Sequence, residues 1–80
     1  MREVQVRYFA ALREQAGVSE ENLETGAATP AELYEELRLR HGMQLPAAML
    51  RVAVNEEFVD WSRPLESGDR IVFIPPVAGG

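Results

Sequence analysis

The last six residues, 75–80 (PPVAGG), have the residue types best suited to chemistry. Two prolines stiffen the segment and remove two backbone donors, so no sheet ladder continues through them. Two small residues and two glycines follow, which makes the segment narrow enough to enter a tight slot. We predict that the carboxylate of Gly80, once activated as an acyl-adenylate or thioester, is the reactive group. The residues predicted to insert into a partner enzyme are Pro75, Pro76, Val77, Ala78 and Gly79.

The alternative interpretation of this segment is an inert terminus that happens to be rich in small residues, which is common in proteins. The rigid Pro-Pro-Val run between the last predicted strand and the two glycines favours the functional interpretation, because a disordered end does not need it.

The rest of the composition offers few groups for catalysis. The chain has no cysteine, which excludes a disulfide, a thiolate nucleophile and a cysteine-ligated metal. The single histidine, His41, falls where a helix should end, and a cation-capable side chain is usual there. We therefore predict no metal site and no bound cofactor. An enzyme in its own right is the least expected class, because no catalytic site can be assembled from these residues.

The net charge of −5, with arginine as every one of the eight basic residues, bears on the choice of partner. An acidic chain argues against nucleic-acid binding and for a partner with a basic surface. The sequence shows no signal peptide or membrane span, because Met1 leads almost directly into an alternating pattern, so we expect a cytoplasmic protein.

The first half of the chain predicts two strands and two helices. Alternating residues predict a half-buried strand over 3–9, and strong helix formers before Gly17 predict one or two helical turns over 10–16. The acidic segment 19–25 suits a short edge strand. A capping box, with Thr29 at the N-cap, proline next and Glu32 at the third helical position, begins the main helix, which Gly42 ends.

The second half predicts the remaining strands. A turn of helix is expected near residues 47–49, followed by a strand over 51–55, a short return strand over 58–59 and an apolar strand over 70–74. One main helix on one face of a mixed sheet of four to five strands is an α+β pattern, in the β-grasp or ubiquitin-like arrangement. We expect a β-grasp domain over residues 1–74 and an extended tail over residues 75–80.

Four apolar residues are expected to lie together on the sheet face that the helix leaves uncovered. Monomeric proteins seldom leave such a patch unused, so it is a candidate partner surface beside the tail. Its members are Phe9, Phe58, Val72 and Ile74. For Phe9 the alternative stays open that it ends its strand and folds under the next turn. We interpret the scattered acidic residues as solvated surface: Glu20, Glu21, Glu56 and Glu57.

Several motifs along the chain carry a resemblance to a known family. They are Tyr8-Phe9-Ala10-x-Leu12-Arg13-Glu14 with Gly17, the helix start at 29–32, Val52-Ala53-Val54-Asn55, Pro64-Leu65-x-x-Gly68-Asp69, and the end from Phe73 to Gly80. Together they cover essentially the whole chain, and the F-x-P-P-V-x-G-G end joined to A-x-L-R-E is the specific part. On these residues the chain resembles the small subunit of molybdopterin synthase, the MoaD family of sulfur carriers.

The resemblance implies a mechanism. A ubiquitin-activating-type adenylyltransferase (MoeB family) would use ATP to convert the Gly80 carboxylate to an acyl-adenylate. A sulfur donor protein would then displace AMP and leave a thiocarboxylate. The tail would enter the large synthase subunit (MoaE family), where the sulfur would pass to a cyclic pyranopterin monophosphate. The resemblance implies two carriers on one large-subunit dimer, with the catalytic residues in the large subunit.

Three rival functions remain open. Sulfur carriers for thiamine biosynthesis or for tRNA thiolation share the fold and the Gly-Gly end. A ubiquitin-like modifier would instead form isopeptide bonds with lysines of other proteins. A β-grasp interaction domain with an inert tail would keep all activity after loss of Gly79 and Gly80.

Overall fold

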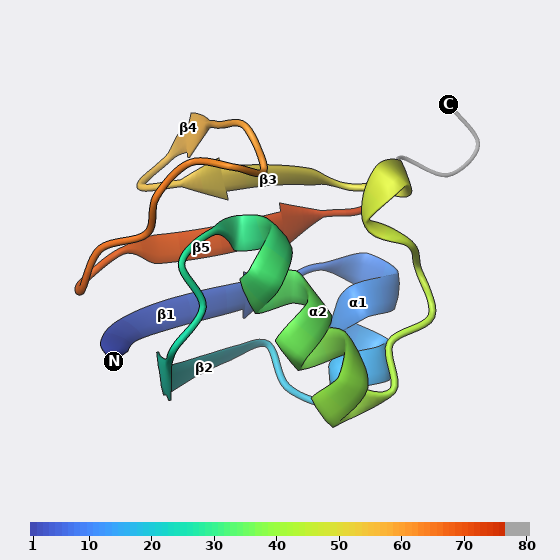
Figure 1. The fold of residues 1–80 in the computed structure, drawn as a ribbon. Coiled ribbons are helices and arrows are strands. Elements are labelled where there is room, and N and C mark those ends of the chain that lie inside the picture. Colours follow the sequence, from blue (N-terminus) through green and yellow to red (C-terminus); the bar gives the residue numbers. More distant parts are fainter. Residues whose placement is uncertain (77–80) are drawn as a thin grey trace.

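A five-stranded mixed sheet is the framework of the protein, in a computed structural model that describes residues 1–76 (Figure 1). Its strands are β1 (Arg2–Tyr8), β2 (Glu20–Thr25), β3 (Arg51–Val54), β4 (Glu57–Phe58) and β5 (Arg70–Ile74). The spatial order is β2-β1-β5-β3-β4, and only β1 and β5 run parallel to each other. The first and last strands therefore pair at the centre, as the predicted β-grasp fold requires.

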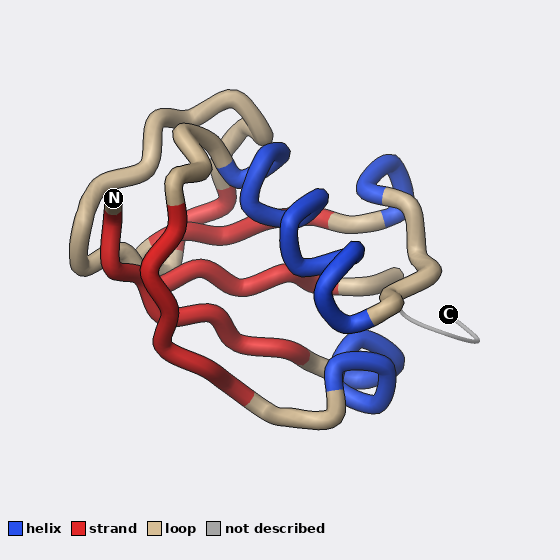
Figure 2. The backbone as a smooth tube through the Cα atoms, turned by 60° about the horizontal axis from the view of Figure 1, so that its bottom comes forward, coloured by secondary structure: helices blue, strands red, loops and turns tan. Residues whose placement is uncertain are grey.

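The helices lie on one side of this sheet, with α2 (Pro30–His41) running across the strands and α1 (Ala10–Ala16) near the end of β1 (Figure 2). A short 3₁₀ helix, η1 (Ala47–Met49), lies just before β3, where a turn of helix was predicted. The α+β class with one main helix on one face of the sheet is thus confirmed.

The predicted capping box of α2 is present with one difference. The Glu32 N–H donates to Thr29 Oγ1 at 3.3 Å, and the Glu32 carboxylate accepts from the backbone N–H of Ala28 at 3.0 Å, one residue before the N-cap. Gly42 ends the helix with a φ of 70°, a left-handed conformation that costs glycine little. The contacts at both ends fix where α2 starts and stops.

The core fills the space between α2 and the inner face of the sheet. Alternate residues of the three central strands point inward and are almost fully buried, as the period of two predicts. From α2, Leu33, Tyr34 and Leu37 meet them. Tyr34, Trp61 and Phe73 form an aromatic cluster with ring centroids 5.1 to 6.0 Å apart. Burial on this side accounts for most of the hydrophobic stabilisation.

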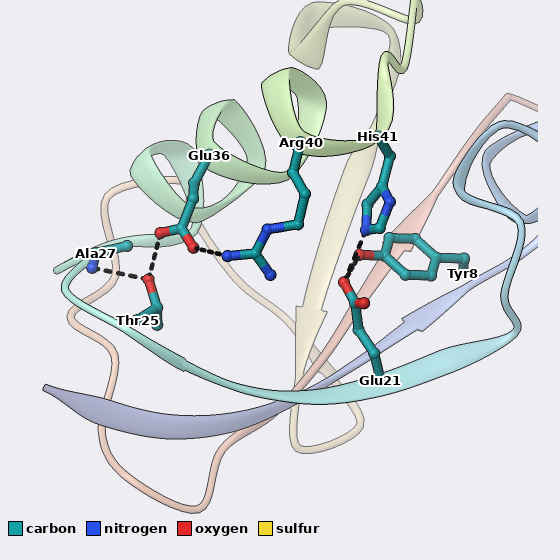
Figure 3. Close-up of polar contacts among 7 residues, drawn as sticks. All are labelled: Tyr8, Glu21, Thr25, Ala27, Glu36, Arg40 and His41. Carbon is teal, nitrogen blue, oxygen red and sulfur yellow. Dashed lines mark hydrogen bonds and ion pairs between the residues drawn. The ribbon is translucent and has the colours of Figure 1, made fainter.

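A second set of contacts ties α2 to the edge strand β2 (Figure 3). The Thr25 hydroxyl donates to Glu36 Oε1 at 2.6 Å and accepts from the Ala27 N–H at 3.0 Å. Arg40 donates to the same Glu36 carboxylate at 3.2 Å. Thr25 is buried, so these bonds satisfy polar atoms that would otherwise be costly to bury.

The β3–β4 connection differs from the prediction. The predicted return strand, residues 58–59, is instead β4 at Glu57–Phe58, because the turn uses only Asn55 and Glu56. Their φ values are 52° and 73°, the two positive angles of a type I′ hairpin turn. The Asn55 side chain holds the turn by donating to Asp69 at 3.0 Å and accepting from the Arg70 N–H at 3.0 Å.

Candidate interaction face and tail exit

The predicted tail leaves the molecule from the end of the central strand. β5 lies between β1 and β3, and its last residue, Ile74, is opposite Arg51 of β3. Pro75 is half-buried and Pro76 is exposed. Neither proline has an N–H to donate, so the ladder cannot extend past Ile74 through them. The other predicted tail residues lie outside the described residues, and the predictions for them stay predictions: Val77, Ala78, Gly79 and Gly80.

The sheet face opposite α2, which we call the outer face, brings three of the predicted patch residues together. Ala53 of β3 is opposite Val72 on one side and Phe58 on the other, so all three side chains point the same way. Ile74 follows Val72 by two residues and shares its face. Phe58 is 61% exposed, while Val72 and Ile74 are half-buried.

Phe9 joins this set from the end of β1. The strand was predicted to include Phe9 but ends at Tyr8, because Ala10 has a φ of 51° and the chain turns there into α1. Phe9 itself stays extended, at φ −127° and ψ 153°, so its side chain points away from buried Tyr8, toward the outer face. It is 43% exposed, so it does not fold under the following turn. We call Phe9, Phe58, Val72 and Ile74 the outer patch.

The sequence reasoning missed three residues of the same face. The Arg51 guanidinium carbon lies 4.6 Å from the centre of the Phe58 ring, a cation–π contact. Ala53 forms the buried floor between Phe58 and Val72, and Arg7 is opposite Val72. The sequence could have placed Arg51 and Ala53 on this face, because they alternate with residues predicted to point inward.

Charged pairs border the outer patch toward β2 and the β3–β4 turn. Arg7 Nε lies 3.4 Å from Glu20, and Arg70 lies 3.7 Å from Glu56. All four side chains are largely exposed, and pairs of this kind contribute little to stability. The prediction that Glu20 and Glu56 are solvated surface residues is therefore confirmed.

Glu21 does not fit the prediction of a solvated glutamate. Its Oε1 accepts from the Tyr8 hydroxyl at 2.7 Å and lies 3.0 Å from His41 Nε2 (Figure 3). The Glu21 and His41 side chains are only 22% and 16% exposed. The cluster joins β1, β2 and the last turn of α2, so His41 does sit at a helix end but has a specific partner there.

The electrostatics of this cluster keep its groups in fixed roles. Partial burial acts to raise the pKa of Glu21, but the hydrogen bonds from His41 and Tyr8, with the positive charges of His41 and Arg40, lower it below its ordinary value. Burial, with the hydrogen bond to Glu21 and its charge, raises the pKa of Tyr8 well above the ordinary range. Glu21 therefore stays ionised as an acceptor and Tyr8 stays a donor, an arrangement suited to structure rather than to proton transfer.

A second buried carboxylate, Asp69, organises the turn before β5. It accepts from Arg63 at 2.9 Å, from the Asn55 amide at 3.0 Å and from the Glu66 N–H at 2.8 Å. Burial acts to raise the pKa of Asp69, and these donors lower it below its ordinary value. Asp69 thus fixes the start of β5, the strand that carries the tail.

The described residues bring an apolar patch together beside the start of the tail. Across residues 1–76, no group of three or more histidine and carboxylate side chains is placed to hold a metal ion. Over the same residues, no helix has the length and hydropathy needed to cross a membrane. The arrangement that these residues do show is an apolar patch bordered by arginines, beside the point where the tail begins.

Comparisons with known proteins agree with this picture. Residues 6–80 match the model of the ThiS family. The chain is 31% identical over 80 residues to the molybdopterin synthase sulfur carrier subunit of Escherichia coli, covering 96% of this chain and 99% of that one. It is 35% identical over 83 residues to the protein of the same name from Homo sapiens, covering 98% and 94%.

A solved structure is also similar along its whole length. It is the protein–protein complex of subunits 1 and 2 of molybdopterin-converting factor from Helicobacter pylori. One of its chains superposes with a TM-score of 0.69 at 28% identity, covering 98% of this chain and 99% of that chain.

Proposed function

The chain belongs to the ThiS family, beside the molybdopterin synthase sulfur carrier subunits, and we propose that it is the sulfur-carrier subunit of a molybdopterin synthase. The observation that carries this proposal is identity of 31% and 35% to two such carriers over nearly the whole of each chain. The outer patch beside the tail exit supports this proposal, because a carrier must bind its partner enzyme while its tail reacts.

The reactive group in this proposal is the carboxylate of Gly80. A carboxylate oxygen attacks the α-phosphorus of ATP and pyrophosphate leaves, which gives an acyl-adenylate. The terminal sulfur of a persulfide on a donor protein then attacks the acyl carbon and AMP leaves, which gives an acyl disulfide with the donor. A thiol on a second cysteine of the donor attacks the donor's own sulfur, so a disulfide forms there and the thiocarboxylate is released. A thiocarboxylate ionises at lower pH than a cysteine thiol and is a ready nucleophile, so the carrier needs no general base of its own.

Two partner enzymes carry out the steps around this group. A MoeB-family adenylyltransferase consumes the ATP, so the carrier itself holds no cofactor. The large synthase subunit, of the MoaE family, takes up Pro75 and the residues after it and catalyses sulfur transfer to the cyclic pyranopterin. Two carriers serve one large-subunit dimer in the cytoplasm. The Helicobacter pylori complex of subunits 1 and 2 supports a partner of this kind.

Intact-mass measurement tests the proposal directly. The protein is incubated with ATP, the adenylyltransferase and a sulfur donor. We expect a mass increase equal to replacement of one oxygen by sulfur, located at Gly80, and no increase in a variant lacking Gly80. The adenylyltransferase is first shown to be active, because it releases pyrophosphate with another carrier. If the mass of this protein then stays unchanged, the proposal is contradicted.

A second stage identifies the acceptor. Adding the large subunit and the pterin precursor should consume the thiocarboxylate and return the original mass. A thiocarboxylate that persists there, but is consumed in thiamine or tRNA thiolation, would assign the carrier to another pathway. Adducts with lysines of other proteins would point to a modifier.

A further inference from the structure

A groove of about 750 Å³ lies along the β3–β4 edge of the sheet and shares only Phe58 with the outer patch. The start of β3 forms one side, and the segment from β4 into the following loop forms the other. The lining residues are Leu50, Arg51, Val52, Phe58, Val59, Asp60, Trp61, Ser62, Arg63 and Pro64. Its size falls within the range of sites that hold a small molecule or a short peptide segment.

Two aromatic residues line the groove, one held by the core and one largely exposed. The Trp61 ring stacks on buried Phe73, with ring centroids 5.8 Å apart and planes 11° from parallel, and it meets Tyr34 edge-on at 6.0 Å. The core therefore holds Trp61 in place before any ligand arrives. Phe58 lines the groove as a largely exposed ring that points to the outer face. A preformed aromatic wall reduces the entropy cost of binding.

One residue of the groove, Arg51, is placed to bind an anionic group. Arg51 and Arg63 line it with one carboxylate, Asp60, in a chain whose net charge is −5. Arg63 is engaged by Asp69 at 2.9 Å and by the Pro64 carbonyl at 3.1 Å. Arg51 makes no hydrogen bond or ion pair within residues 1–76, and its guanidinium carbon lies 4.6 Å from the centre of the Phe58 ring. Its donors are thus open to a carboxylate, which a guanidinium can bind through two parallel bonds.

The groove is continuous with the tail exit. Arg51 is directly opposite Ile74, the last residue of β5, and Phe58 belongs to both the groove and the outer patch. A partner that binds both the outer patch and the tail therefore also covers the opening of the groove.

We propose that this edge groove binds an extended segment of the large synthase subunit that presents an apolar side chain to Trp61 and Phe58 and a carboxylate to Arg51. This inference rests on the proposed function. The two aromatic residues select the apolar group and Arg51 selects the carboxylate. The groove thus adds a second contact with the partner besides the tail. Together, the two contacts fix the orientation of the carrier on its partner.

Trp61 is the only tryptophan of the chain and so provides a single probe within the groove. The carrier is labelled with 5-fluorotryptophan, and its one fluorine resonance is followed while the large subunit is added. We expect a shift of this resonance on binding. Raising the concentration of the carrier alone serves as a second titration, and a shift there would assign the groove to another copy of the chain and overturn the proposal.

A matched pair of variants tests the role of Arg51. Arg51→Gln and Arg70→Gln each remove one exposed arginine of the outer face and change the net charge equally. We expect Arg51→Gln to weaken binding of the large subunit about tenfold and Arg70→Gln less than about twofold. Equal losses would reveal a general charge effect and overturn the proposal.

The remaining outcomes separate the two proposals. Binding of the wild-type carrier with an unshifted Trp61 resonance would overturn the groove proposal and leave the sulfur-carrier function intact. No binding to the large subunit at all would contradict both.

Discussion

The two faces of β5 present apolar residues in opposite circumstances. Ile71 and Phe73 point inward and are almost fully buried, whereas Val72 and Ile74 point outward and are half-buried. All four side chains are of the kind that stabilises a core, but only the inner pair lies under α2. The inner face thus contributes to the stability of the fold, while the outer face leaves apolar surface exposed in the free protein.

The difference teaches where stability and function reside in a chain of 80 residues. A domain of this size buries only about 60% of its unfolded surface and has little stability in reserve. Apolar residues left on an open face give up stabilisation that they would gain inside, so their placement indicates a partner that covers them. The tail begins on the same strand, which links that partner to the chemistry.

The largest expected effect is that of deleting Gly80, which should abolish function while leaving the stability of the fold unchanged. The deletion moves the terminal carboxylate back to Gly79, one residue short of the proposed reactive position, and changes no residue of the described core, so we expect sulfur transfer to be abolished and the thermal midpoint to be unchanged. Activity is measured as thiocarboxylate formation, and stability by circular dichroism. A lowered midpoint would mean that Gly80 also contributes to the fold.

Ile71→Ala should have the opposite effect. Ile71 is almost fully buried on the inner face of β5, so the cavity should cost about 2–5 kcal/mol of unfolding free energy. Urea denaturation measures the loss. If the protein remains folded, its affinity for the large subunit, corrected for the unfolded fraction, should stay within about twofold. A larger corrected loss would show that the two faces are coupled.

Ile74→Ala should affect binding more than stability. Its side chain lies on the outer face and is half-buried, so we expect less than about 1 kcal/mol of lost stability and about a tenfold loss of affinity for the large subunit. Phe9→Ala should behave in the same way from the other end of the patch. Calorimetric titration gives the affinities, and unchanged values for both variants would remove the outer patch from the interface.

The smallest expected effect concerns acid stability at the β1–β2 end. The pKa of Glu21 is lowered in the folded protein, so its stabilising contribution is present above the ordinary glutamate value of 4.5 and is lost as pH falls through the folded pKa. Between about pH 5 and pH 3, wild-type protein should therefore lose more stability than Glu21→Gln.

Glu24→Gln, an exposed glutamate on the same strand, is the control for that comparison. Urea denaturation is measured for all three proteins across the same pH range. If wild type and Glu21→Gln lose stability in parallel, the Glu21 contacts do not contribute to acid sensitivity.

Local patterns predicted the elements and both faces of the central strands. The capping box placed the start of α2, and period-two alternation placed Val72, Ile74 and Phe58 outward. Contacts between distant residues could not be predicted in this way. Glu21 is charged and lies on an edge strand, and only its contact with His41, twenty residues later, makes it part of the interior.

The β4 boundary and the groove were missed for related reasons. Glutamate rarely adopts a positive φ, so the two-residue turn at Asn55 and Glu56 has no sequence signal beyond the asparagine. The groove depends on how the loop containing Trp61 returns under the sheet edge, which alternation within a strand does not determine.

The position of β5 also has a mechanical consequence. A partner that draws in the tail pulls along the axis of this strand, and the bonds to β1 and β3 run across that axis. Tension is therefore shared among the bonds on both sides instead of opening them one by one, as it would at an edge strand. At the start of β5, far from the tail, the Gln5 N–H donates to Asp69 O at 3.0 Å and the Gly68 N–H donates to Glu3 O at 2.7 Å. These bonds tie that end of β5 to β1. We therefore expect the fold to resist force applied at the tail better than it would if the tail left from an edge strand.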